Sequence, residues 1–139
     1  MNSLAHQIVL VPVDYSTESQ HALKVGREVV APGGVVHALH VLHVAPIGMV
    51  APPTSSVEQI AHSQQHLQQF LTDTGITDAM THIVEGDPGL EIVKLAEKLH
   101  ADLIVIPSRG RTGLAHILIG SVAERVVRLA NCPVLVLRK

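Results

Sequence analysis

Short runs of consecutive apolar residues recur along the chain, and each run is bounded by glycine, proline or polar residues. Such runs predict strands that are buried on both faces of a sheet, because every position in them then meets apolar surroundings. The predicted strands are residues 8–13, 35–44, 80–84, 103–106 and 134–137.

Between these runs, apolar residues recur every three or four positions, which is the spacing of a helix that packs along one side. Each helix has a capping signal at its start, a Ser, Thr or Asp that is followed by Glu, Gln or Pro. The predicted N-caps are Thr17, Ser55, Asp87 and Ser121, and the helices are expected to end near Pro32, Gly75, His100 and Ala130. The predicted inner face of the second helix consists of Val57, Ile60, Ala61, Leu67 and Leu71.

Strands and helices alternate from one end of the sequence to the other. Parallel strands cannot be joined by hairpins, so this order predicts an α/β fold with a five-stranded parallel sheet and helices on both faces. Ligands bind to such sheets beyond the carboxyl ends of the strands, where the strand order reverses. Asp14 follows the first strand and a glycine-containing loop follows the fourth, so both would line one crevice if those strands are neighbours.

The composition favours a single domain with an aliphatic core. At 139 residues the chain is expected to form one domain, residues 1–139, burying roughly two-thirds of its unfolded surface. Hydrophobic residues make up 47% of the chain but aromatic residues only 1%, so the core must be built from Val, Leu, Ile and Ala. Such a core suits a helix-covered parallel sheet.

The charge is nearly balanced, with ten Lys and Arg against twelve Asp and Glu. No basic run interleaved with aromatic residues appears, so a nucleic-acid partner is not expected. No apolar run approaches the roughly 18 residues that span a bilayer, and the N-terminus has no signal-like segment, so we expect a cytoplasmic protein without a membrane partner. Cys132 is the only cysteine, which excludes an internal disulfide and fits a reducing compartment.

Residues 102–121 change character three times, and they hold the main candidate site. An apolar strand ends at Pro107, a loop rich in Gly, Ser, Thr and Arg follows, and Gly120-Ser121 begins a helix. A helix start beside a glycine-rich loop favours anion binding, since backbone amides face the ligand there. Arg109 and Arg111 could meet such an anion, although an arginine on a loop is more often solvated.

The spacing in this segment resembles the nucleotide-binding signature of the universal stress protein family, G-x2-G-x9-G-[S/T], through Gly110, Gly120 and Ser121. The resemblance covers nearly the whole chain, and it includes I-V-L-V-P-V-D-Y-S, L-H-V, E-G-D-P, A-D-L-I-V-I and C-P-V-L-V-L-R. It implies the strand order 3-2-1-4-5 of adenine nucleotide alpha hydrolase-like proteins, binding of ATP, ADP or AMP with a possible Mg²⁺ ion, and a homodimer formed through Val134–Leu137. One position departs from the signature, because Pro107 stands where the first glycine is expected.

The resemblance also implies which residues bind the nucleotide. Asp14 is expected at the ribose or a phosphate-bound metal, although an aspartate at this position can also simply begin a helix. Val41 matches the valine whose backbone contacts adenine, but the repeated L-H-V pattern leaves Val44 as an alternative. The implied nucleotide-binding residues are Pro12, Val13, Asp14, Val41, Pro107, Arg109, Gly110, Gly120, Ser121 and Val122.

Other chemistry-bearing residues are assigned structural roles. His62 and His66 have a spacing that can bind Zn²⁺, but they are expected to face away from the inner side of their helix, and no metal site is predicted. His37 and His43 share a strand face and are expected to be packed or to face a dimer partner. Cys132 is expected to be a small buried apolar residue.

The sequence contains no G-x4-G-K-[S/T], no G-x-G-x-x-G after the first strand and no G-x-S-x-G, so no dedicated catalytic machinery is visible. Three functions remain open at this point. The first is a nucleotide-binding stress-response regulator. The second is a slow ATPase in which Asp14 and Mg²⁺ position water, and the third is a structural dimer that has lost nucleotide binding because of Pro107.

Overall fold

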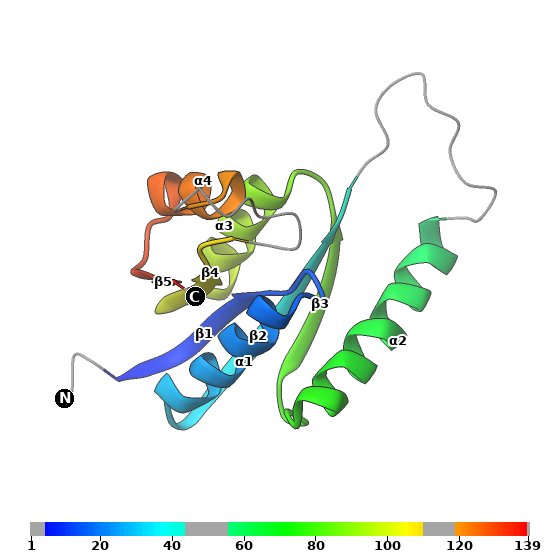
Figure 1. Ribbon diagram of the computed structural model, residues 1–139, viewed down its shortest axis with the longest axis horizontal. Coiled ribbons are helices and arrows are strands. Elements are labelled where there is room, and N and C mark those ends of the chain that lie inside the picture. Colours follow the sequence, from blue (N-terminus) through cyan, green and yellow to red (C-terminus); the bar gives the residue numbers. More distant parts are fainter. Residues whose placement is uncertain (1–4, 44–55, 110–118, 139) are drawn as a thin grey trace.

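The computed structural model describes residues 5–43, 56–109 and 119–138, which form an alternating series of strands and helices (Figure 1). The elements are β1 (His6–Pro12), α1 (Thr17–Val29), β2 (Val30–Leu42), α2 (Ser56–Thr74), β3 (Met80–Glu85), α3 (Pro88–Leu99), β4 (Leu103–Pro107), α4 (Ser121–Leu129) and β5 (Val134–Leu137).

The described strands form one sheet in the order β3-β2-β1-β4-β5, and every neighbouring pair is parallel. This confirms the predicted α/β fold and the adjacency of β1 and β4. The chain leaves β1 toward β2 on one side and β4 lies on the other, so the strand order reverses at β1. A crevice for a ligand is therefore expected at the carboxyl end of this strand.

The helices cover both faces of the sheet, as predicted (Figure 1). On one face, Ala22 and Leu23 of α1 and Leu67 of α2 pack against alternate residues of the central strands. On the other face, Ile92 of α3 and Val126 of α4 pack against the remaining ones. The buried residues of both clusters are Val, Leu, Ile and Ala, which agrees with the scarcity of aromatic residues.

The predicted start of the first helix is wrong by one residue. Ser16, rather than Thr17, is the N-cap, because its hydroxyl accepts a hydrogen bond from the amide of Ser19 at 3.0 Å. Ser16 has extended backbone angles and Thr17 is already helical. A capping side chain must stand just outside the helix, and Ser16 satisfies this condition.

The second strand begins earlier than predicted, at Val30 instead of Val35. The helix before it ends at Val29, and Pro32, Gly33 and Gly34 lie within β2 as an irregularity in its pairing with β1. Gly33 has a positive φ of 82°, and a Cβ on Gly34 would stand 2.7 Å from the carbonyl oxygen of Gln7. The glycines thus form a bulge in the strand.

Only the second half of α2 packs on the sheet. Leu67 and Leu71 are buried as predicted and Ile60 is half-buried, but Ala61 is exposed and Val57 is 74% exposed. The predicted inner face is therefore wrong in its first turns, where Val57 and Ala61 do not pack on the sheet. The predicted N-cap Ser55 lies outside the described residues.

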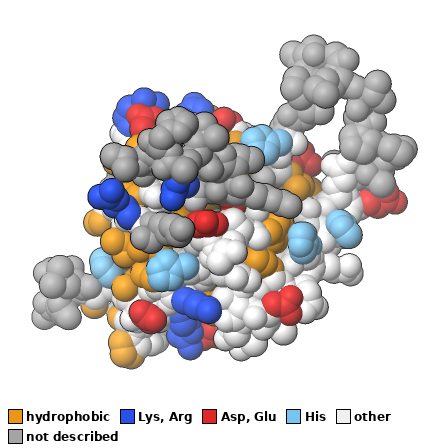
Figure 2. Space-filling view, in the orientation of Figure 1, with side chains coloured by type: hydrophobic (Ala, Val, Ile, Leu, Met, Phe, Trp, Pro, Cys, Tyr) orange, Lys and Arg blue, Asp and Glu red, His pale blue; other side chains and the backbone are white. Residues whose placement is uncertain are grey.

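None of the helices in the described part of the chain is long and apolar enough to cross a membrane. On the face of the molecule shown in Figure 2, positive and negative side chains are interspersed.

Candidate functional site

A cavity of about 730 Å³ opens at the carboxyl ends of the central strands. Its walls come from the ends of β1, β2 and β4 and from the first turns of α3 and α4. The volume lies within the range of small-molecule sites, and the position is the one at which open parallel sheets bind ligands.

The cavity brings together residues that are far apart in the sequence. Of the ten residues predicted to bind nucleotide, Gly110 lies outside the described residues and the other nine line the cavity. These nine are Pro12, Val13, Asp14, Val41, Pro107, Arg109, Gly120, Ser121 and Val122. The alternative adenine contact, Val44, also lies outside the described residues.

The start of α4 differs from the prediction. Gly120 is the N-cap, because its carbonyl accepts the first helical hydrogen bond from the amide of Glu124 at 2.9 Å. Ser121 is therefore the first helical residue and does not cap the helix. Glycine has no side chain that could accept from the next amides, so the first-turn amides of Ser121 and Val122 have no side-chain cap.

A backbone contact joins the end of β4 to the start of α4. The amide of Gly120 donates to the carbonyl oxygen of Ser108. The amide of Ser108 in turn donates to the carbonyl oxygen of Leu137 of β5 at 2.8 Å. A Cβ on Gly120 would stand 3.2 Å from the Ser108 carbonyl oxygen, so the close approach favours glycine. Pro107 is the buried last residue of β4 rather than a terminator outside the strand. The contact fixes the helix start beside Pro107.

The carboxylate of Asp14 lines the cavity and also supports the start of α1. Its Oδ1 accepts from the Ser16 amide at 3.0 Å and from the Ser16 hydroxyl. Ser16 in turn caps α1. Asp14 therefore both supports the start of a helix and lies beside the cavity. Its hydrogen bonds with Ser16 hold the side chain in a fixed orientation.

His40 is a cavity residue that the sequence reasoning did not single out. Its Nδ1 donates to the carbonyl oxygen of Val13 at 2.7 Å, which fixes the ring beside the end of β1. Burial lowers the pKa of His40, and the bond to Val13 offsets part of that shift. The L-H-V motif contained the signal, because it lies at the carboxyl end of a parallel strand, where the crevice of such a sheet forms.

Tyr15 contacts His40 and belongs to a cluster of aromatic rings. Its ring centroid is 4.5 Å from that of His40 and 3.9 Å from that of His66, and Phe70 meets it edge-on at 5.3 Å. His62 and His66 are exposed, as expected for residues that face away from the inner side of α2, but the ring of His66 also stacks on Tyr15, which was not predicted. Burial raises the pKa of Tyr15 to about 12.

The remaining histidine and cysteine predictions have separate outcomes. His37 is packed, as expected, and its Nδ1 lies 2.8 Å from Nε2 of His82 on β3. His43 is exposed and lines the cavity. Cys132 is half-buried against the α3 and α4 side of the core, and burial is the main cause of its raised pKa.

The cavity combines apolar walls with a few polar groups. The apolar side chains include Val41, Ile92, Ile106 and Val122, and the sequence reasoning missed Ile92 because it lies on a helix remote from the glycine loop. Charged side chains of both signs, Asp14, Glu124 and Arg109, also line it. Within the described ranges, no group of three or more His, Cys, Asp or Glu residues could hold a metal ion.

Known proteins resemble this chain along most of its length. It is 37% identical to universal stress protein MJ0531 of Methanocaldococcus jannaschii, over 94% of this chain and 81% of that protein. It is 32% identical to universal stress protein G of Shigella flexneri, over 96% of this chain and 99% of that protein.

Solved structures share the fold. Protein MJ0577 of Methanocaldococcus jannaschii superposes with a TM-score of 0.73 at 31% identity, over 96% of each chain. A universal stress protein in complex with cAMP superposes with a TM-score of 0.67 at 26% identity, over 96% of this chain and 97% of the other. The sequence profile of the universal stress protein family matches residues 6–138, and the chain therefore belongs to this family.

Proposed function

We propose that this protein binds ATP, ADP or AMP in the cavity and acts as a cytoplasmic stress-response regulator. The observation that carries the proposal is the start of α4, where the amides of Ser121 and Val122 have no side-chain cap and belong to residues that line the cavity. The positive end of a helix that lacks a capping side chain stabilises an anion, and a nucleotide supplies one as phosphate.

The other cavity residues suit the remaining parts of a nucleotide. The aliphatic side chains of Val41, Ile92 and Ile106 offer apolar walls for a flat base. Asp14 could accept hydrogen bonds from ribose hydroxyls, or share a Mg²⁺ ion with the phosphates. A related universal stress protein was solved in complex with cAMP, which supports an adenine-containing ligand.

Pro107 weakens binding in this proposal but does not abolish it. Proline has no amide hydrogen, and the loss of one amide donor to a charged phosphate costs about 1.5–3 kcal/mol, or about a tenfold to hundredfold loss of affinity. The amides of Ser121 and Val122 and the Ser121 hydroxyl remain, and each charge-assisted contact is of similar size. Several remaining donors outweigh the one that is missing.

Titration calorimetry with ATP tests the proposal on three proteins. The unmodified protein is expected to bind, Pro107→Gly to bind about tenfold to hundredfold more tightly, and the double variant Gly120→Val with Ser121→Ala not to bind. A Cβ at position 120 crowds the Ser108 carbonyl oxygen at 3.2 Å, so circular dichroism must show that the double variant is folded. If only the Pro107→Gly variant gives heat of ATP binding, a structural dimer that does not bind nucleotide becomes the better interpretation.

Slow hydrolysis of bound ATP is the second candidate activity, and Asp14 is its candidate residue. One oxygen of Asp14 already accepts two hydrogen bonds from Ser16, which suits a carboxylate that orients a ligand or Mg²⁺ better than one that accepts a proton. If the Asp14→Asn variant still releases phosphate from ATP at the same rate, Asp14 does not have this role.

We also propose a homodimer formed through β5. This strand is the end of the described sheet, so one of its edges has no strand partner among the described residues. Unpaired strand edges are templates for pairing with another chain.

A further inference from the structure

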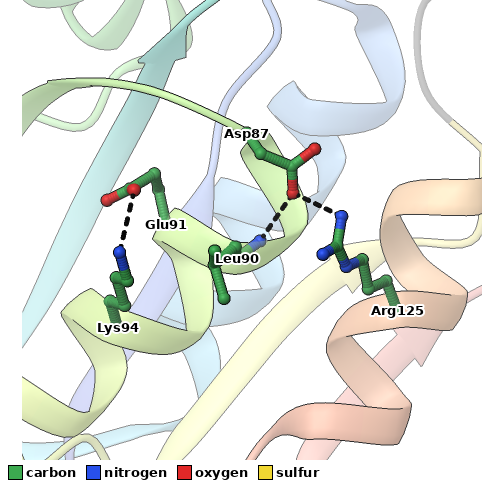
Figure 3. Close-up of polar contacts among 5 residues, drawn as sticks. All are labelled: Asp87, Leu90, Glu91, Lys94 and Arg125. Carbon is green, nitrogen blue, oxygen red and sulfur yellow. Dashed lines mark hydrogen bonds and ion pairs between the residues drawn. The ribbon is translucent and has the colours of Figure 1, made fainter.

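An ion pair joins the first turn of α3 to the middle of α4 (Figure 3). Oδ2 of Asp87 lies 2.7 Å from Nη1 of Arg125, and the same carboxylate oxygen accepts from the amide of Leu90 at 3.1 Å. Asp87 is the N-cap of α3, so a single oxygen both caps one helix and holds the other.

The stem of Arg125 contacts the backbone of α3. A Cβ on the buried Gly89 would stand 2.9 Å from Cδ of Arg125 and 3.2 Å from its Cβ and Cγ. The absence of a side chain at Gly89 therefore lets the arginine lie flat across the first turn of α3. At this point α4 contacts α3 in two ways, through the apolar methylene groups of Arg125 and through the ion pair of its guanidinium group with Asp87.

These two helices form opposing walls of the cavity. Pro88 and Ile92 line it from α3, and Ser121 and Glu124 line it from α4. Asp87 directly precedes one wall and Arg125 directly follows the other. The spacing between the walls, and the orientation of the Ser121 amide, therefore depend on how α4 lies against α3.

We propose that Asp87 and Arg125 are positioning residues for the ligand, and that their ion pair holds the uncapped start of α4 at the distance from α3 that nucleotide binding requires. This inference rests on the proposed function. Neither residue needs to touch the ligand, because both act through the placement of the α4 amides.

A purely electrostatic influence predicts a different pattern. If only charge near the cavity mattered, Asp87→Asn would strengthen ATP binding by removing a negative charge, and Arg125→Met would weaken it. If the pair positions α4, both variants weaken binding, and the double variant is no worse than either single one, because the same contact is lost in each.

The two substitutions isolate the ion pair from its surroundings. Asn caps a helix as well as Asp, so Asp87→Asn keeps the cap on α3. Met keeps the apolar stem of Arg125 over Gly89. Calorimetry with ATP is expected to show an affinity loss of about twofold to fivefold in each single variant, since exposed ion pairs are weak.

The ion pair between Arg27 and Asp78 provides a matched control. Its N–O distance of 2.8 Å and its exposure are similar, but neither residue is next to a cavity-lining residue in the sequence, whereas Asp87 and Arg125 both are. Arg27→Met and Asp78→Asn are expected to leave ATP affinity unchanged. Equal losses in the control variants would attribute the effect to general stability and overturn the inference.

Hydrogen exchange without nucleotide separates this inference from the proposed function. The hydrogen-bonded amides of α4, from Glu124 onward, are expected to exchange about twofold to fivefold faster in Asp87→Asn and Arg125→Met than in the unmodified and control proteins. If the variants exchange faster but the unmodified protein does not bind ATP, the positioning role stands and the proposed nucleotide binding is wrong. Unchanged exchange would overturn the positioning role, whatever the affinity of the unmodified protein.

Discussion

Tyr15 occupies an unfavourable position at the level of a single residue. Its φ is 67°, in the left-handed region, and its buried hydroxyl has no hydrogen-bond partner among the described residues. An unpaired buried polar group costs about 1–3 kcal/mol, so Tyr15→Phe, which keeps the ring between His40 and His66, is expected to raise the free energy of unfolding by about 1 kcal/mol. Urea unfolding measures the change, and a loss of stability would show that the hydroxyl is bonded in solution.

The backbone strain at Tyr15 can be tested separately by comparing two variants that both remove the ring. Tyr15→Gly is expected to be more stable than Tyr15→Ala by about 1 kcal/mol, because glycine adopts a positive φ without a steric penalty. Equal stability in urea would contradict the left-handed conformation. The comparison cancels the loss of ring stacking, which both variants share.

The burial of His37 and His82 makes stability depend on pH. Burial lowers the pKa of both rings below 6.5, and His37 and Lys98 lower that of His82 further. The unfolded chain therefore binds more protons than the folded one between the lowered pKa values and 6.5, so stability falls as the pH falls through this window. His82→Gln removes one such group and is expected to reduce the slope of Tm against pH below pH 6.5. An unchanged slope would contradict the assignment.

Asp102 connects two elements, the start of β4 and the start of β1. Its Oδ2 accepts from the amides of Gln7 and Ile8, both at 2.8 Å. The ladder between β1 and β4 contains only the pairs Val9 with Leu103 and Leu10 with Ile104, so these side-chain bonds extend a short pairing. Asp102→Ala is expected to cost about 1–3 kcal/mol in urea unfolding. Asp102→Asn keeps one acceptor oxygen and should cost less, and equal losses would argue against the hydrogen bonds.

The strands were more predictable from the sequence pattern than the ends of the helices, whereas the strand order came from the family resemblance. A short apolar run such as residues 103–106, bounded by Asp102 and Pro107, favours a strand in a sheet that is covered on both faces. In contrast, Ser16, Thr17, Gly120 and Ser121 are all acceptable N-caps by residue type. The choice of Gly120 depended on its tertiary contact with Ser108, which a local pattern does not contain. At Ser16 the decisive partner was local, because Asp14 accepts from its amide and hydroxyl.

The candidate site was predictable where its residues follow strands and not where they lie on helices. Asp14 and Pro107 come at strand ends, and strand ends meet at one edge of a parallel sheet. Ile92 lies one turn inside α3, and its contact with the cavity depends on the angle at which α3 crosses the sheet. The prediction that Val57 is buried was wrong, because a helical pattern does not reveal which turns of a helix pack on the sheet.

At the scale of the whole molecule, the proposed dimer depends on the backbone of β5. The carbonyls of Pro133 and Leu137 accept from β4, at 3.0 and 2.8 Å. Backbone groups of successive residues in a strand point to alternate sides. The amides of residues 135 and 137 therefore face β4, whereas those of Val134 and Val136 face the open edge. Val136 lies inside the strand, so a second copy that pairs along β5 is expected to accept from its amide.

Proline substitutions at adjacent positions separate dimer formation from folding. Proline is tolerated on an edge strand when its missing amide faces outward, so Val136→Pro is expected to keep the fold and lose the dimer. Leu135→Pro removes an amide that faces β4 and is expected to destabilise the fold itself by about 1–3 kcal/mol, because a ladder hydrogen bond is lost. Light scattering reports the mass and circular dichroism the fold. A folded Val136→Pro variant that remains dimeric would contradict a dimer in which the Val136 amide pairs β5 with a second copy.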